Sequence, residues 1–175
     1  MLTQEVLPGI ELRLLEKRHT STFFNFIEKG RAGFENWIPF VSKTLTKEDA
    51  ENKISSFLEI HKNGNGYFWG LWHNNTIIGM ILIKDIDMST RSAEIGCMID
   101  KEYEGRGIIR ESSRMMIGFL FKDLNMNKII LCCDENNDRS IKIAKYFNFE
   151  HEGTLKQNIV INGKLRNTMH WALFN

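Results

Sequence analysis

The stretch Tyr103-Glu104-Gly105-Arg106-Gly107-Ile108-Ile109-Arg110 is the most informative part of this 175-residue sequence. It follows a segment of alternating apolar and polar residues and precedes one with helical spacing, so it is predicted to join a strand to a helix. The first N–H groups of a helix have no partner within it, and the helix dipole favours an anion there. Glycines allow the backbone to approach a phosphate closely. The stretch therefore predicts a pyrophosphate-binding turn.

Two familiar phosphate-binding motifs do not match this turn. A dinucleotide-binding Gly-x-Gly-x-x-Gly motif would need glycine where the chain has Arg110. A Walker motif would need Gly-Lys followed by Ser or Thr, which is absent. A Gly-x-Gly sequence alone is a weak signal, so a plain strand-to-helix turn remains the alternative at this point.

Outward from the turn, the pattern of apolar residues predicts alternating blocks of strands and helices. Strands are expected at residues 10–14, 67–73, 76–83, 92–99, 129–133, 149–155 and 166–173, and helices around residues 23–27, 50–61, 116–124 and 143–147. Gly30 is the expected end of the first helix, and Thr46 and Asp49 have the spacing of a capping box. Asn162-Gly163 predicts a hairpin turn.

The strand at residues 92–99 separates its residues between two faces of a sheet. Ala93, Ile95, Cys97 and Ile99 are expected on one face, with Glu94, Gly96 and Met98 on the other. By the same alternation, the adjacent Cys132 and Cys133 are expected to point to opposite faces.

Composition limits the class of protein. With 23 basic and 22 acidic residues the net charge is +1, which argues against nucleic-acid binding through a broad basic surface. Three cysteines without Cys-x-x-Cys spacing and five histidines without metal-binding spacing predict neither disulfides nor a metal site. Met1–Gly9 does not resemble a secretory signal, and the longest apolar run, Ile77–Ile83, is far shorter than the ~20 residues that span a bilayer. We therefore expect a cytoplasmic protein without membrane contact.

Four motifs lie in order along the chain. They are Ser92-Ala93-Glu94-Ile95-Gly96, the turn Glu104–Ile109, Asn137-Asp138-Arg139-Ser140, and Glu152-Gly153 followed by Leu155-Lys156. On these motifs, residues 10–173 resemble the GNAT superfamily of acyl-CoA-dependent N-acetyltransferases, and within it the RimJ/RimL branch of ribosomal-protein N-terminal acetyltransferases. The phosphate turn of the superfamily has the pattern [QR]-G-x-G-x-[GA], so Glu104 and Ile109 depart from it. We expect the Glu104 side chain to cap the empty helix N-terminus.

The resemblance implies a fold and an activity. It implies a single GNAT-like α+β domain at residues 1–175, with a mixed, mostly antiparallel twisted sheet of about seven strands and about four helices. It also implies direct transfer of an acetyl group from acetyl-CoA to a primary amine, such as a protein or peptide N-terminus. The alternatives are acetylation of a small amine such as a polyamine or an aminoglycoside, a non-catalytic CoA-binding regulatory module, and a generic nucleotide-phosphate binder. Monomer and homodimer both remain open.

The resemblance also assigns residues to the donor. The backbone of Cys97, Met98 and Ile99 is expected to pair with the pantetheine arm of CoA, and Cys97 itself is interpreted as a core residue rather than a nucleophile. The pyrophosphate is expected at Glu104, Gly105, Arg106, Gly107, Ile108, Ile109 and Arg110. Asn137 is either a ligand of the arm or a turn residue. Arg139, Lys142 and Lys145 are either ligands of the 3′-phosphate or a solvated face.

Two residues are expected to move protons. Glu94 is the candidate base, acting through water, with a solvated surface glutamate as the alternative. Ser140 is the candidate acid for the departing thiolate and also a candidate helix N-cap. Deprotonating a lysine near neutral pH costs about 4 kcal/mol and an α-amine only about 1, so one weak base favours an N-terminal acceptor. The segment Trp37-Ile38-Pro39-Phe40 is expected in the core or at the acceptor cleft.

Overall fold

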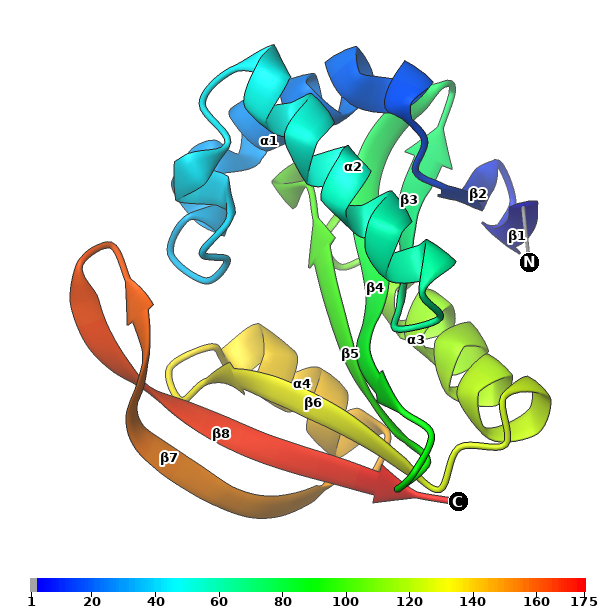
Figure 1. Ribbon diagram of the computed structural model, residues 1–175, viewed down its shortest axis with the longest axis vertical. Helices are drawn as coiled ribbons and strands as arrows, with labels where there is room; N and C mark the ends of the chain where they lie inside the picture. Colours follow the sequence, from blue (N-terminus) through cyan, green and yellow to red (C-terminus); the bar gives the residue numbers. More distant parts are fainter. Residues whose placement is uncertain (1–2) are drawn as a thin grey trace.

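One twisted sheet organises the protein, as seen in a computed structural model that describes residues 3–175 (Figure 1). Within these residues its strands are β1 Thr3–Leu7, β2 Ile10–Leu14, β3 Tyr67–His73, β4 Thr76–Asp87, β5 Ser92–Ile99, β6 Lys128–Asp134, β7 Glu150–Ile161 and β8 Lys164–Phe174. Their order is β1-β2-β3-β4-β5-β6-β8-β7, and only β5 and β6 pair in parallel. The predicted mostly antiparallel α+β fold is confirmed. The sequence pattern does not predict β1, because this edge strand is largely exposed and lacks a buried alternation.

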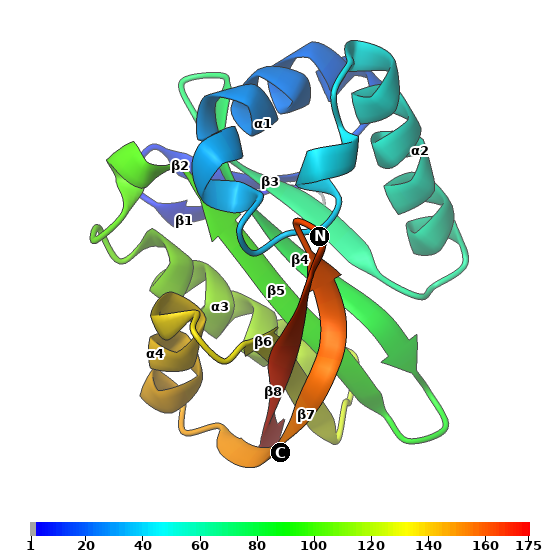
Figure 2. The ribbon, with the colours of Figure 1, turned by 90° about the vertical axis from the view of Figure 1, so that its left-hand side faces the viewer.

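Helices cover both faces of the sheet. They are α1 Thr20–Phe34, α2 Lys47–Lys62, α3 Ile108–Gly118 and α4 Asp138–Tyr146, with short 3-10 turns at Lys17–His19, Val41–Lys43 and Lys101–Tyr103 and a π turn at Phe119–Asp123. Helices α1 and α2 pack on the face that bears Met80 and Met98, whereas α3 and α4 pack on the face that bears Ile81 and Ile95. Figure 2 shows α1 and α2 toward one end of the sheet, with α3 and α4 toward the other.

The expected end of α1 at Gly30 is wrong, because the helix continues to Phe34. The Phe34 ring lies where a Cβ atom of residue 30 would be, and it also packs against Phe26 with ring centroids 5.1 Å apart. Gly30 therefore makes room for an aromatic ring. The predicted capping box of α2 is confirmed, since Asp49 N donates to Thr46 Oγ1 at 3.1 Å and Thr46 N donates to Asp49 Oδ2 at 2.9 Å.

The hairpin of β7 and β8 is longer than the sequence pattern predicts. Its turn is as expected, with Asn162 and Gly163 both at positive φ, 50° and 72°. The register shifts between Leu155 and Ile159, where Gln157 also has a positive φ of 50° and its N–H donates to Asn167 Oδ1 at 2.9 Å. This irregularity breaks the alternation, which is why the pattern indicates an end near residue 155.

Strands β5 and β6 separate after a short parallel contact, and this separation positions the site. They pair only from Ser92↔Lys128 to Ile95↔Leu131. Beyond that point the second half of β5 stays paired with β4, and the second half of β6 stays paired with β8. The two strands therefore form a V that opens toward their C-terminal ends, visible in Figure 1.

Candidate active site

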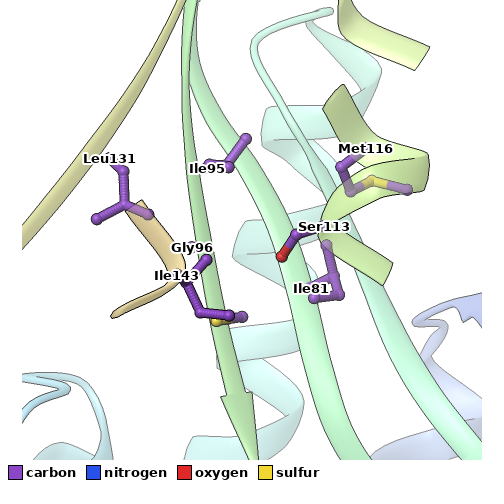
Figure 3. A pocket seen from close by; sticks show the side chains of 8 residues that line it. Ile81, Ile95, Gly96, Ser113, Met116, Leu131 and Ile143 are labelled. Atoms are coloured by element: carbon purple, nitrogen blue, oxygen red, sulfur yellow. The ribbon is translucent and has the colours of Figure 1, made fainter. Parts of the chain in front are cut away.

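A narrow apolar crevice occupies the V on the side of α3 and α4 (Figure 3). Its lining residues are Ile81, Ile95, Gly96, Cys97, Ser113, Met116, Leu131 and Ile143. They come from β4, β5, β6, α3 and α4, so the crevice runs along the inner edge of β5. Because no strand among residues 3–175 pairs with Gly96 to Ile99 on this edge, their backbone groups are available to a bound chain.

The alternation predicted for β5 is confirmed, and it separates two surfaces of the V. Cys97 and Ile99 pack with the cluster under α3, whereas Met98 belongs to the cluster under α1 and α2. Burial raises the pKa of the Cys97 thiol to about 11. The thiol is therefore protonated near neutral pH, which agrees with a core residue and not with a nucleophile.

The glycine turn lies at the start of α3. Gly105 and Gly107 have φ values of 73° and 77°, a left-handed conformation that favours glycine. Gly107 is the N-cap of α3 and has no side chain with which to cap it. A Cβ at Gly105 would meet no atom within 4 Å, so space is open beside the loop. These are the features that an anion-binding helix N-terminus requires.

The Glu104 carboxylate forms an ion pair that the sequence does not predict. The expectation that Glu104 caps α3 is wrong. Its carboxylate instead accepts a hydrogen bond from the Arg139 guanidinium at the start of α4. Nearby, the Arg106 guanidinium lies 4.9 Å from the centre of the Tyr103 ring. The pair joins the glycine turn to α4, and it places a cation beside Glu104, one of the two residues that depart from the [QR]-G-x-G-x-[GA] pattern.

The start of α4 assigns the helix N-cap to Asn137 and not to Ser140, which was the expected candidate. Asn137 is the N-cap, because its Oδ1 accepts the Ser140 N–H at 3.2 Å. Ser140 is therefore not the cap. Asp134 shapes the preceding turn, since its Oδ1 accepts the Asn136 N–H at 2.8 Å. The Ser140 side chain is thus free of the capping role that its position in the sequence suggests.

Glu94 lies on the face of β5 opposite the crevice, with its side chain 17% exposed. Its Oε1 is 2.8 Å from Lys84 Nζ on β4, in register with it. Burial lowers the pKa of the Lys84 ammonium, but the neighbouring Glu94 and Asp85 carboxylates outweigh burial and leave that pKa raised. The candidate base is therefore paired with a charged lysine, a residue that the sequence does not single out.

Two further side chains continue from the Lys84–Glu94 pair across the sheet, one on β6 and one on β8. Cys132 of β6 lies beside the Glu94 carboxylate, and its Sγ lies 3.4 Å from Nδ1 of His170 on β8. Burial, and next the charge of Glu94, raise the pKa of the Cys132 thiol to about 12. The expected orientation of the two adjacent cysteines is confirmed, since Cys133 packs in the opposite cluster. His170 has no sequence signal, because only the pairing of β6 with β8 brings it here.

The face of the V opposite the crevice is bounded by the segment after α1 and by β8. The Arg166 guanidinium lies 6.0 Å from the centre of the Trp37 ring, and its Nε is 2.8 Å from Asp134 Oδ2. Ile38 and Phe40 instead pack against the core beneath α1 and α2. Ile38 and Phe40 therefore agree with the expectation of a core position, whereas Trp37 lies beside Arg166 and its place at an acceptor cleft stays a prediction.

No group of three or more potential metal ligands occurs in the part of the chain that the structure describes. No helix among the described residues is long and apolar enough to cross a membrane. Lys142 and Lys145 are exposed on α4.

The fold, the crevice and the glycine turn agree with a match of this sequence to the model of one protein family. The family model described as "Acetyltransferase (GNAT) domain" matches residues 10–150. The chain belongs to the GNAT acetyltransferase family.

The chain is also similar to individual acetyltransferases. The chain is 28% identical over 174 residues to the Bacillus subtilis (strain 168) protein named "Putative ribosomal N-acetyltransferase YdaF", covering 99% of this chain and 95% of that protein. It is 30% identical over 96 residues to spermidine N(1)-acetyltransferase of Escherichia coli (strain K12), covering 55% and 52%. The structure of RimL, a ribosomal L7/L12 alpha-N-protein acetyltransferase in complex with coenzyme A, superposes with a TM-score of 0.92 at 19% identity, covering 98% and 97%. At that identity the superposition shows the fold alone.

The start of α4 gives a first testable prediction. Asn137→Ala should lower the free energy of unfolding by about 1 kcal/mol, because it removes the N-cap. Ser140→Ala should change it by less than about 0.5 kcal/mol, as for a substitution that breaks no such contact. Urea denaturation of both variants measures the difference. A larger loss in Ser140→Ala than in Asn137→Ala would contradict this assignment of the cap.

Proposed function

We propose that this protein transfers the acetyl group of acetyl-CoA to the α-amine of a protein N-terminus. The observation that supports it most is the V between β5 and β6, with the uncapped glycine turn of α3 at its end. Membership of the acetyltransferase family and the similarity to YdaF over nearly the whole chain support the same activity. If the acceptor is a ribosomal protein, this protein acts in the cytoplasm.

The residues present fit the donor. The free inner edge of β5, at Cys97, Met98 and Ile99, would hold the pantetheine arm, because its amides need partners of the kind that a strand offers. The turn from Glu104 to Arg110 would hold the pyrophosphate at the α3 N-terminus. Asn137 would contact the arm from the start of α4. Bound acetyl-CoA supplies the activated acetyl group as a thioester.

The chain itself contributes two proton transfers and one electrostatic contact. Glu94 takes a proton from the amine, through water, on the face of β5 opposite the crevice. A backbone N–H of the unpaired half of β5 donates to the acetyl carbonyl oxygen as negative charge develops on it. Ser140, which is not needed as the cap of α4, donates a proton to the thiolate.

The charges of the acceptor side favour an acceptor with a single amine. Both carboxylates that face the V from β5 and β6, Glu94 and Asp134, are already paired with cations, Lys84 and Arg166. A polyamine carries several positive charges and binds best where unpaired carboxylates are available. The similarity to spermidine acetyltransferases keeps that acceptor as the second candidate.

A panel of acceptors tests the function. We expect the purified protein to release CoA thiol from acetyl-CoA with peptides that have a free N-terminal amine. We expect slower release with spermidine and with an N-acetylated peptide whose one amine is a lysine, because lysine costs about 3 kcal/mol more to deprotonate. Turnover with spermidine alone would favour the second candidate. Tight CoA binding without turnover of any amine would indicate a non-catalytic module.

The glycine turn gives a prediction about donor affinity. Gly107→Val should raise the dissociation constant of CoA by at least about tenfold, a loss of ~1.4 kcal/mol, because a side chain would block backbone approach to the phosphates. Gly64 has nearly the same φ, 74°, and lies far along the chain in open space. Gly64→Val is therefore the matched control for backbone strain, and it should leave CoA affinity unchanged. Equal affinities in the two folded variants, measured by calorimetry, would rule out this placement of the pyrophosphate.

Glu94→Gln tests the base, because it keeps size and hydrogen bonding but removes the basic oxygen. Turnover at neutral pH should fall about 10²-fold. Raising the pH should restore much of it for an α-amine, which is mostly free above about pH 8, whereas a lysine acceptor would recover only near pH 10. Steady-state rates from pH 6 to 10 measure this. Wild-type turnover across that range would mean that the amine loses its proton in solvent.

A further inference from the structure

Four side chains form a continuous row across neighbouring strands on the acceptor face of the V. Lys84 of β4, Glu94 of β5, Cys132 of β6 and His170 of β8 lie in that order. Lys84 Nζ is 2.8 Å from Glu94 Oε1, Glu94 contacts the Cys132 thiol, and Cys132 Sγ is 3.4 Å from His170 Nδ1. The proposed mechanism uses only Glu94, so the rest of the row has no assigned role.

Lys84, at one end of the row, cannot accept a proton from Glu94. A protonated lysine has three donors and no acceptor, so it cannot take a proton from Glu94. The Glu94 side chain is also only 17% exposed, so beyond the one water that bridges it to the amine it has little contact with bulk solvent. After each acetyl transfer, Glu94 must lose the proton that it took from the amine before it can act again. The remaining neighbour in the row is Cys132.

Cys132 is suited to pass a proton on. Burial and the nearby Glu94 carboxylate keep its thiol protonated near neutral pH. A protonated thiol donates one hydrogen bond and accepts another, so it can take a proton on one side as it gives one up on the other. Its sulfur lies 3.4 Å and 3.9 Å from the two ring nitrogens of His170, so either neutral tautomer of the ring can accept.

His170 connects the row to solvent. Its side chain is partly exposed, and within residues 3–175 its ring is seen hydrogen-bonded to Cys132 alone. Gly153, opposite on β7, has no side chain. The other charged groups around this part of the face are Glu152, bound to Lys128 at 2.7 Å, and Asp134, bound to Arg166 at 2.8 Å. Each of these carboxylates is paired with a cation of its own. Cys132 is therefore the group that is placed to give a proton to the His170 ring.

We propose that Cys132 and His170 carry the amine proton from Glu94 to solvent, an inference that rests on the proposed acetyl transfer. The protonated Glu94 carboxyl gives its proton to Cys132 Sγ while the thiol proton moves to a ring nitrogen of His170. The imidazolium then gives one proton to water. Glu94 returns to carboxylate, Cys132 to thiol and His170 to neutral imidazole, so one proton is released per acetyl group transferred. Cys132 and His170 are positioning residues, since they act through Glu94.

Substitutions that break or preserve the relay test it. Cys132→Ala and His170→Gln should each lower kcat on the order of tenfold, a modest share of a general-base effect, with KM unchanged for acetyl-CoA and acceptor. The double variant should lose no more than either single one, because both residues serve one path. Cys132→Ser keeps a hydroxyl that can relay and should restore most of kcat. His151→Gln, on the exposed part of β7, is the matched control and should leave kcat unchanged.

One further readout separates a relay from a packing role. In the free protein, the imidazole ¹⁵N resonances of His170 should shift in Cys132→Ala but not in His151→Gln.

Different outcomes would overturn the relay and the proposed acetyl transfer. Wild-type kcat in Cys132→Ala and His170→Gln, together with unchanged His170 ¹⁵N shifts in Cys132→Ala, would exclude the relay while leaving acetyl transfer intact. A loss in Cys132→Ser as large as in Cys132→Ala would exclude it too. A wild-type protein that turns over no amine would overturn the proposed function and the relay with it.

Discussion

The separation of β5 from β6 is the constraint on which the rest of this structure depends. Parallel pairing ends at Ile95↔Leu131, yet both strands continue, because β4 holds the outer edge of one and β8 holds the outer edge of the other. Unpaired backbone inside a sheet is costly unless another partner satisfies it. The V is therefore a gap kept open by its flanks, with an apolar crevice on one side and a polar row on the other. The glycine turn and α4 both begin where it is open.

Sequence and structure agree where local pattern decides the outcome. The alternation along β5 separates Glu94 from Cys97 correctly, and the Asn162-Gly163 turn fixes its hairpin. The pattern fails where packing decides, as at Gly30, which accommodates a ring inside a helix that it was expected to end. It also fails at Ser140, where the neighbouring Asn137 takes the cap that either residue type could provide.

Long-range register accounts for the site residues that have no sequence signal. His170 is 38 residues from Cys132, and Lys84 faces Glu94 only because β4 and β5 pair in one particular register. Arg166 reaches Asp134 from β8, the strand of the hairpin that pairs with β6, and also lies over Trp37. A shift of one residue in any of these pairings would send the side chain to the opposite face, and no local pattern specifies that choice.

The charges at the two openings of the V show how the chain accommodates a departure from the family pattern. Glu104 brings a carboxylate to a turn suited to anions, and Arg139 of α4 pairs with it. The Arg139 side chain is 72% exposed, and exposed ion pairs contribute only about 0–1 kcal/mol. An anion with several charges at this turn outweighs one carboxylate in attracting the guanidinium, so exchange of partners costs little. Arg139 thus neutralises Glu104 without closing the turn, and Lys84 likewise neutralises Glu94 on the opposite face of β5, where the Cys132 thiol lies beside it.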